Sequence, residues 1–245
     1  MPNFWRVLDK VIADADVIVE VLDSRSVSET RNREIEDKVL RSGKKLVLAM
    51  NKCDLVSKEK LEQYKKELEN AVFVSAKDRH GTAILKDAIL KIAGYPKSLN
   101  IGIVGYPNTG KSSLINSLVG RSRARSSPES GFTKGMQKIR LSSRITLIDT
   151  PGVIPYIEKD ELKHGTIGSV DHSKVKDPES VFLDIFTKHK DAITRHYGTD
   201  AEDYDDFLEA IAGRFNYLKK GAEADTTRAA RKILKDWQSG KIIVD

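Results

Sequence analysis

The sequence predicts an α/β fold, with a doubly wound, mostly parallel sheet and a small α-helical domain after it. Two observations support this fold class. Over residues 1–152, short apolar runs rich in β-formers alternate with helical patterns, and buried strands separated by helices are typical of parallel sheets. After Gly152 the strand pattern stops and amphipathic helical patterns follow. We therefore expect an α/β domain over 1–155, a linker over 156–175 and a helical domain over 176–245.

Each expected element has a local signature. Apolar runs predict strands at 16–22, 45–50, 71–75, 100–104, 136–141 and 144–148. Helical spacing predicts helices at 30–41, 57–69, 82–93, 178–189, 201–213 and 226–238, and a further helix from Lys111. Ser57 is the expected cap of the second helix, because a serine hydroxyl accepts hydrogen bonds from the first helical turn. Residues 153–178 are expected to be irregular, and Phe215 and Trp237 to lie in the core of the helical domain.

The composition is that of a soluble, globular protein, with 39% hydrophobic and 32% charged residues. No apolar run approaches the ~20 residues that span a membrane. The single cysteine, Cys53, rules out an internal disulfide and is typical of a reducing cytoplasm. The histidines are scattered without cysteine partners, which argues against a zinc cluster. We expect a cytoplasmic monomer.

The positive charge is concentrated in one segment. The formal net charge is +6, and residues 121–144 hold seven Lys or Arg against one Glu. Clustered cations on a soluble protein indicate a polyanionic partner such as nucleic acid. The alternative is a solvated basic loop.

The segment from Gly105 to Ser112 is a complete phosphate-binding loop between an expected strand and an expected helix. Its glycines permit the turn that points backbone N–H groups at phosphate oxygens. Lys111 would reach the β- and γ-phosphates, and the Ser112 hydroxyl would bind Mg²⁺. The expected nucleotide-binding residues of this loop are Asn108, Thr109, Gly110, Lys111, Ser112 and Ser113.

Asn51-Lys52-Cys53-Asp54 is typical of a guanine-specificity box. The Asp54 carboxylate can accept from N1–H and N2–H₂ of guanine, a pattern that adenine lacks, and a site of this kind can reject the wrong base by about 10⁴-fold. The Lys52 stem can lie on the base plane, and Asn51 can tie this loop to the phosphate loop. Ser75-Ala76-Lys77 fits an accessory loop in which the Ala76 amide meets O6 of guanine.

The order of these motifs is inverted, because the guanine box precedes the phosphate loop. In ordinary GTPases the phosphate loop comes first, so the chain is expected to be a circularly permuted GTPase domain that binds GTP and GDP. Asp149-Thr150-Pro151-Gly152 ends a strand downstream. There Asp149 would hold Mg²⁺ through water and the Gly152 amide would contact the γ-phosphate.

The order N-K-C-D, S-A-K, G-Y-P-N-T-G-K-S-S, G-F-T-K-G, D-T-P-G resembles that of the circularly permuted GTPases of the YlqF/RbgA type, which act in assembly of the large ribosomal subunit. The resemblance implies that Thr133 is the threonine of the first switch, meeting Mg²⁺ and γ-phosphate only in the GTP state. It assigns catalysis to Lys111, Thr133 and Gly152, and Mg²⁺ to Ser112, Thr133 and Asp149. Asn108 matches the position that binds K⁺ in cation-dependent relatives; a plain turn residue is the alternative.

Hydrolysis is expected to be slow without a partner. Val153 stands where Ras-like enzymes carry the glutamine that orients the attacking water, and an apolar side chain cannot do so. The family's N-terminal Pro-Gly-His element is replaced by Asn3-Phe4-Trp5-Arg6, so the water-activating group is unassigned. The second switch, which starts at Asp149, runs directly into the linker and the helical domain, as expected of a nucleotide-gated switch.

The resemblance implies ribosomal RNA, or a precursor of the large ribosomal subunit, as the partner. The candidate RNA contacts are Arg121, Arg123, Arg125, Lys134, Arg228, Arg231, Lys232 and Lys235. Three alternatives stay open: a free-standing hydrolase or nucleotide kinase, a GTP-regulated protein-binding module, and an RNA-processing GTPase that does not act on the ribosome. Asp23-Ser24-Arg25 matches a D-[AS]-R pattern of the family, with no role assigned by the sequence.

Overall fold

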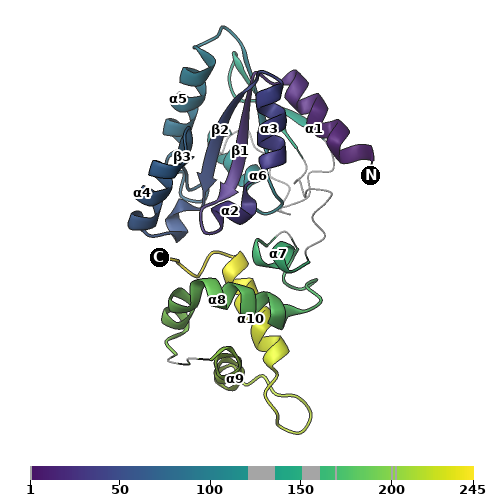
Figure 1. The fold of residues 1–245 in the computed structure, drawn as a ribbon, viewed down its shortest axis with the longest axis vertical. Coiled ribbons are helices and arrows are strands. Elements are labelled where there is room, and N and C mark those ends of the chain that lie inside the picture. Colours follow the sequence, from purple (N-terminus) through teal and green to yellow (C-terminus); the bar gives the residue numbers. More distant parts are fainter. Residues whose placement is uncertain (1, 121–135, 151–160, 169, 200, 202) are drawn as a thin grey trace. The chain divides into compact units, whose positions relative to one another are not determined.

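The computed structural model describes residues 2–120, 136–150, 161–168, 170–199, 201 and 203–245 (Figure 1). The chain divides into two compact units, Met1–Glu158 and Lys159–Asp245.

The first unit is built on a six-stranded sheet with the strand order β3-β2-β1-β4-β6-β5. The strands are β1 (Val17–Asp23), β2 (Lys45–Asn51), β3 (Ala71–Phe73), β4 (Leu99–Val104), β5 (Gln137–Arg140) and β6 (Ile145–Asp149). Only the edge strand β5 is antiparallel to its neighbour; the other pairings are parallel. The expected mostly parallel sheet is confirmed.

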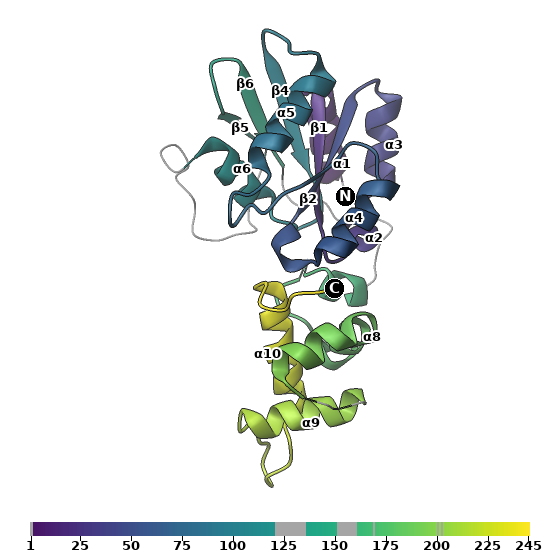
Figure 2. The ribbon, with the colours of Figure 1, turned by 90° about the vertical axis from the view of Figure 1, so that its left-hand side faces the viewer.

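Helices cover both faces of this sheet. They are α1 (Pro2–Asp14), α2 (Val27–Thr30), α3 (Arg33–Arg41), the 3₁₀ turn η1 (Cys53–Leu55), α4 (Lys58–Glu67), α5 (Thr82–Ala93) and α6 (Lys111–Val119). Successive side chains of a strand point to opposite faces. Val19 of β1 therefore packs with α5 and α6, whereas Ile18 packs with α1 and α3. Figure 1 shows α5 on one side of the sheet and α1 and α3 on the other, and Figure 2 shows α5 in front of the strands. This is the doubly wound arrangement.

Two local features differ from the sequence expectation, and one agrees. Helix α1 was not expected, although Leu8, Val11, Ile12 and Ala15 are buried at helical spacing. The helix expected at 30–41 begins later, because the Asn32 side chain caps α3 by accepting from the Ile35 N–H at 3.1 Å. Ser57 caps α4 as expected, accepting from the Lys60 N–H at 3.4 Å.

The second unit consists of the helices α7 (Glu161–Thr166), α8 (Pro178–Tyr197), α9 (Tyr204–Arg214) and α10 (Thr226–Gln238). Helix α7 lies within the segment expected to be irregular. A Cβ at its Gly165 would lie 2.5 Å from Val181 of α8, so this glycine permits close helix packing. Helix α8 runs past its expected end at His189, where the backbone is locally non-helical.

Aromatic side chains form the core of the second unit. Phe182, Phe186 and Phe207 pack with ring centroids 5.1–5.7 Å apart. Trp237 is 1% exposed, as expected, and its Nε1–H donates to the Thr166 carbonyl at 3.1 Å. The expectation that Phe215 is a core residue is wrong: it follows the last residue of α9 and is 38% exposed.

Among the residues that the structure describes, no helix is both long enough and apolar enough to cross a membrane.

Candidate nucleotide-binding site

The sequence motifs gather at one edge of the sheet. Strands β1, β2, β4 and β6 are parallel, so their carboxyl ends meet at the same edge, where ligands of open α/β sheets bind. Asp23 ends β1, Asn51 ends β2, Gly105 follows β4 and Asp149 ends β6. The inverted motif order along the chain thus becomes one compact site in space.

The loop from Gly105 to Lys111 has the geometry of an anion cradle. Gly105 and Gly110 have φ values of 140° and 96°, and the intervening Asn108 has a left-handed φ of 62°. A Cβ at Gly110 would overlap the side-chain nitrogen of Asn51. Gly110 also caps α6, whose free N–H groups point out of the helix end. Glycine is required here because the turn and the close approach both exclude a side chain.

The Lys111 ammonium lies inside this loop. Its Nζ donates to the carbonyl oxygens of Gly105 and Tyr106 at 2.9 and 2.7 Å. Burial lowers the pKa of Lys111 to about 8, against the opposing attraction of the Asp149 carboxylate. A phosphate group would supply the charge that this buried cation needs.

Asn51 joins three motifs. Its Nδ2 donates to the Thr109 carbonyl of the phosphate loop at 2.9 Å, and its Oδ1 accepts from the Ala76 N–H at 3.0 Å. The Ala76 amide is therefore engaged within the protein, and its expected contact with O6 of guanine stays a prediction. The tie between the guanine box and the phosphate loop is present as the sequence reasoning described it.

The rest of the guanine box is held by the backbone and by burial. The Cys53 N–H donates to the Val74 carbonyl at 3.2 Å, and the Cys53 side chain is 8% exposed. Burial raises the pKa of this thiol to about 11, so it stays protonated and acts as a small buried spacer. Asp54, in η1, is partly exposed, which leaves its carboxylate accessible to a base. Ser75 begins the accessory loop, and its hydroxyl donates to Asp78 at 3.1 Å.

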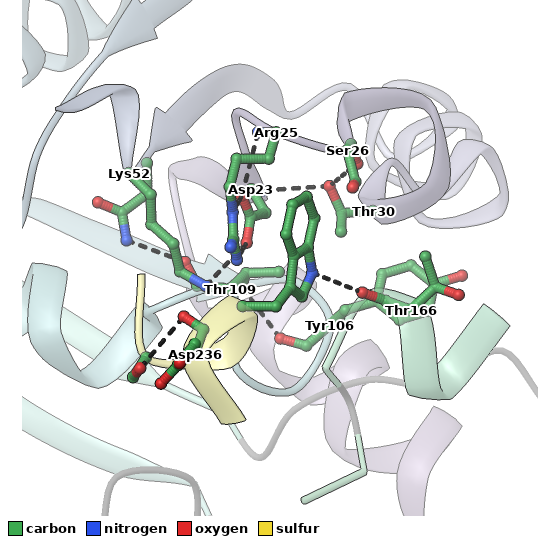
Figure 3. A network of polar contacts seen from close by, with 12 residues as sticks. Asp23, Arg25, Ser26, Thr30, Lys52, Tyr106, Thr109, Thr166 and Asp236 are labelled. Carbon is green, nitrogen blue, oxygen red and sulfur yellow. Dashed lines mark hydrogen bonds and ion pairs between the residues drawn. The ribbon is translucent and has the colours of Figure 1, made fainter. Parts of the chain in front are cut away.

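A buried ion-pair cluster lies beside the box, which sequence reasoning did not identify (Figure 3). Asp23 pairs with both Lys52 and Arg25 at 2.8 Å. Burial by itself would raise the pKa of Asp23, but the two cations lower it well below its usual range. Burial lowers the pKa of Lys52, and Asp23 opposes that change. The available signal was the Asp-x-Arg pattern at the end of the strand next to the box.

The oxygen donors at this edge suit a hard cation. Ser112 is the second residue of α6, and Asp149 is 5% exposed at the end of β6. Hydroxyl and carboxylate oxygens are ligands that Mg²⁺ prefers. The Thr150 hydroxyl donates to the Ile103 carbonyl at 2.8 Å and anchors the chain after Asp149. Within the described residues, no group of three or more His, Cys, Asp or Glu side chains could hold a metal by itself.

Several expected site residues fall outside the part of the chain that the structure describes. These are Arg121, Arg123, Arg125, Thr133, Lys134, Gly152 and Val153.

The four candidate RNA contacts of α10 differ in their surroundings. Arg231 Nη1 donates to the carbonyls of His172 and Ser173 at 3.0 and 3.3 Å, so it serves packing within the unit. Arg228 and Lys232 instead lie over aromatic rings, at 4.3 Å from the Tyr217 centroid and 4.9 Å from the Phe215 centroid respectively. Lys232 also pairs with Asp236. Lys235 is exposed.

Known proteins are similar to this chain in sequence and in fold. The family model described as "50S ribosome-binding GTPase" matches residues 100–205. An uncharacterised GTP-binding protein of Methanocaldococcus jannaschii is 43% identical over 97% of this chain and 65% of its own length. Nucleolar GTP-binding protein 2 of Pneumocystis carinii is 32% identical over 98% of this chain and 53% of its own length. The chain therefore spans about half to two thirds of the length of these relatives.

The fold matches that of a solved structure. The crystal structure of GNP-bound YlqF from T. maritima superposes with a TM-score of 0.69 at 24% identity, covering 98% of this chain and 96% of that one.

Proposed function

We propose that this chain, which belongs to the circularly permuted GTPases of the YlqF type, hydrolyses GTP as a nucleotide-gated switch that binds the RNA of the large ribosomal subunit during its assembly. The observation that supports nucleotide binding most directly is the pair of Asn51 hydrogen bonds. They connect the guanine box with the phosphate loop and the accessory loop. A site that holds base and phosphate elements in one rigid unit is preorganised for a guanine nucleotide.

The proposed roles follow from position and chemistry. Asp54 accepts from the guanine edge, and Lys52 lies with its stem against the base. Lys77, Thr109 and Ser113 are further proposed nucleotide-binding residues. Lys111 and the N–H groups that begin α6 bind the β- and γ-phosphates.

Ser112 and Asp149 hold the magnesium ion, with Thr133 in the GTP state. When bound, Mg²⁺ neutralises charge that develops on the phosphate oxygens. The Gly152 amide contacts the γ-phosphate, and Asn108 is the proposed K⁺ ligand. Val153 offers no group that orients water, so basal hydrolysis is slow and the partner completes the site.

The proposed partner rests on charge and on the relatives. Residues 121–144 carry a net charge of +6, and a cationic segment suits RNA phosphates. The matching family model is described as ribosome-binding, and one relative is a nucleolar protein. We propose that the protein acts in the cytoplasm.

The helical unit offers a second RNA contact. Phe215 and Tyr217 stack with ring centroids 5.7 Å apart, and Phe215 is 38% exposed. Arg228 and Lys232 flank the rings, and Lys235 is exposed on the same helix. Aromatic rings beside cations bind single-stranded nucleotides by stacking and phosphate contact.

The test of this function is GTP turnover by the purified protein, in K⁺ and in Na⁺, with and without isolated large ribosomal subunits. We expect slow basal turnover that rises at least tenfold with the subunits, and a higher rate in K⁺. Fast turnover without subunits would instead support a free-standing hydrolase. Stimulation of GTP turnover by the proteins of these subunits after removal of their RNA would support a protein-binding module.

The base contact has its own test. Asp54→Asn should move the preference from GTP toward XTP, because an amide can donate to the 2-oxo group of xanthine and the carboxylate cannot. Unchanged selectivity for GTP would remove Asp54 from the guanine site.

A further inference from the structure

Asp23 lies where two neighbouring strands end together. It is the last residue of β1 and the register partner of Asn51, the last residue of β2. Its N–H donates to the Thr30 hydroxyl at 3.1 Å, and that hydroxyl donates to the Ser26 carbonyl at 2.7 Å. The Ser24 N–H donates to the Asn51 carbonyl at 2.9 Å. The backbone of Asp23 is thus fixed relative to the guanine box.

The Asp23 carboxylate has donors on both of its oxygens. Oδ1 accepts from the N–H and the Nε–H of Arg25, each at 3.1 Å. Oδ2 accepts from Arg25 Nη2 and from Lys52 Nζ, each at 2.8 Å (Figure 3). The side chains of Asp23 and Arg25 are each 3% exposed, and that of Lys52 is 21% exposed. Arg25 fixes the orientation of the carboxylate, and the carboxylate fixes the ammonium of Lys52.

Lys52 is also held in an uncommon backbone conformation. Its φ of 61° lies in the left-handed region, which is unfavourable for a residue with a Cβ and persists only where the surroundings impose it. Backbone and ammonium are therefore both fixed, and the four methylene groups between them have little freedom.

We propose that Asp23 is a positioning residue for guanine-nucleotide binding, which anchors the Lys52 ammonium so that the lysine stem is already aligned to pack against the base. The inference rests on the proposed function, because it assigns Asp23 a part in that site. The physical reason is entropy. A free lysine side chain loses rotamer freedom when it is fixed against a ligand, and an anchored one has lost that freedom before the ligand arrives.

The alternative is that Asp23 only stabilises the end of β1. The two roles differ in one measurable respect. A positioning residue acts through Lys52, so its effect on affinity disappears when Lys52 has no ammonium group. A purely structural residue affects stability and affinity whatever stands at position 52.

The experiment is a double-mutant cycle with Asp23→Asn and Lys52→Met, read by the dissociation constants of GDP and of inosine diphosphate. Methionine keeps an unbranched apolar stem and removes the charge. Thr30→Val is the matched structural control, because it removes the hydroxyl that holds the Asp23 backbone and leaves the carboxylate in place. Thermal unfolding of every variant is measured alongside.

We expect Asp23→Asn to weaken the binding of GDP and of inosine diphosphate equally, by about tenfold, because packing of the Lys52 stem is common to both bases. In the Lys52→Met background the same change should alter affinity less than twofold. Thr30→Val should lower the melting temperature with affinity changed less than twofold. If Asp23→Asn does not fold, Asp23→Glu keeps the charge and displaces the ammonium by one methylene, and the same pattern is expected at a severalfold loss.

Equal losses from Asp23→Asn in both backgrounds would overturn the inference, and so would unchanged affinity in the wild-type background. Absence of GDP binding by the wild-type protein would overturn the proposed function, which makes the two failures distinguishable.

Discussion

Glu20 is an acidic residue in an unusual position, because it lies in the central region of the sheet. It belongs to β1, whose side chains at this position face the layer of α1 and α3, and it is 0% exposed. Its Oε1 accepts from the Asn32 N–H at 2.8 Å, and its Oε2 has no hydrogen-bond partner among the described residues. Burial raises the pKa of Glu20 to about 8; the Asn32 N–H opposes the rise, and the charge of Glu36 adds to it.

This pKa makes the stability of the first unit depend on pH. The ordinary pKa of the carboxyl is 4.5 and its value in the folded chain is about 8. A raised carboxyl pKa means that the folded state holds the proton more tightly, so stability is greatest below pH 4.5 and falls as the pH rises to 8. Each pH unit in that interval costs about 1.4 kcal/mol, which amounts to about 4 kcal/mol between pH 5 and pH 8.

Glu20→Gln should remove this dependence, because glutamine keeps the acceptor for the Asn32 N–H and cannot ionise. Its new amide N–H groups lie where Oε2 had no partner, which costs about 1–3 kcal/mol at any pH. We therefore expect the variant to be slightly less stable than the wild type at pH 5 and more stable at pH 8. The difference in free energy of unfolding between Glu20→Gln and the wild type should change by about 4 kcal/mol between pH 5 and pH 8.

The assay is urea unfolding read by a brief labelling pulse at Cys53 with a disulfide reagent that reacts at both pH values. Cys53 is the single cysteine of the chain and is buried in the first unit, so labelling reports the unfolding of that unit alone. Glu62→Gln, on the exposed side of α4, removes the same charge and should shift the free energy by less than about 0.5 kcal/mol. A pH-independent difference between Glu20→Gln and wild type would refute the argument that Glu20 is protonated in the folded state.

Three further outcomes are expected. GDP affinity should be constant below pH 8 and fall above it, because the free protein then loses the Lys111 proton that phosphate binding requires. Constant affinity up to pH 9 would contradict this. Lys111→Ala should abolish GDP binding. Gly110→Ala should weaken GDP binding at least tenfold, because the new Cβ would displace the Asn51 side chain that connects the two loops. Gly43→Ala, whose Cβ would have no atom within 4 Å, should leave GDP affinity unchanged. Gly165→Ala should destabilise the second unit by about 1–3 kcal/mol through its valine contact. The matched change Gly213→Ala, where a Cβ would meet no atom within 4 Å, should stabilise the unit by up to about 1 kcal/mol. Equal melting temperatures of the two alanine variants would contradict the packing argument.

Much of the fold could be predicted because its signals are local. The helix over 82–93 and the helix over 226–238 have the expected bounds, since apolar spacing and capping residues act within one or two turns. Ser57 could be identified as a cap for the same reason. The N-terminal helix α1 was not predicted although its buried residues have helical spacing, because Arg6, Asp9 and Lys10 interrupt the apolar residues.

The sequence by itself determined which motifs are present and in what order, and hence the permuted arrangement, because these are properties of the chain. The tertiary structure decided which side chains meet. Asp23 and Lys52 are 29 positions apart, and Asn51 and Thr109 are 58 apart. Each pair depends on the register and order of strands that sequence periodicity does not specify. The same holds for Arg231, which the sequence placed with its basic neighbours and the fold turns to backbone carbonyls. Contacts of this kind arise from packing between distant segments, and the pKa of each ionisable group depends on the burial that only packing creates.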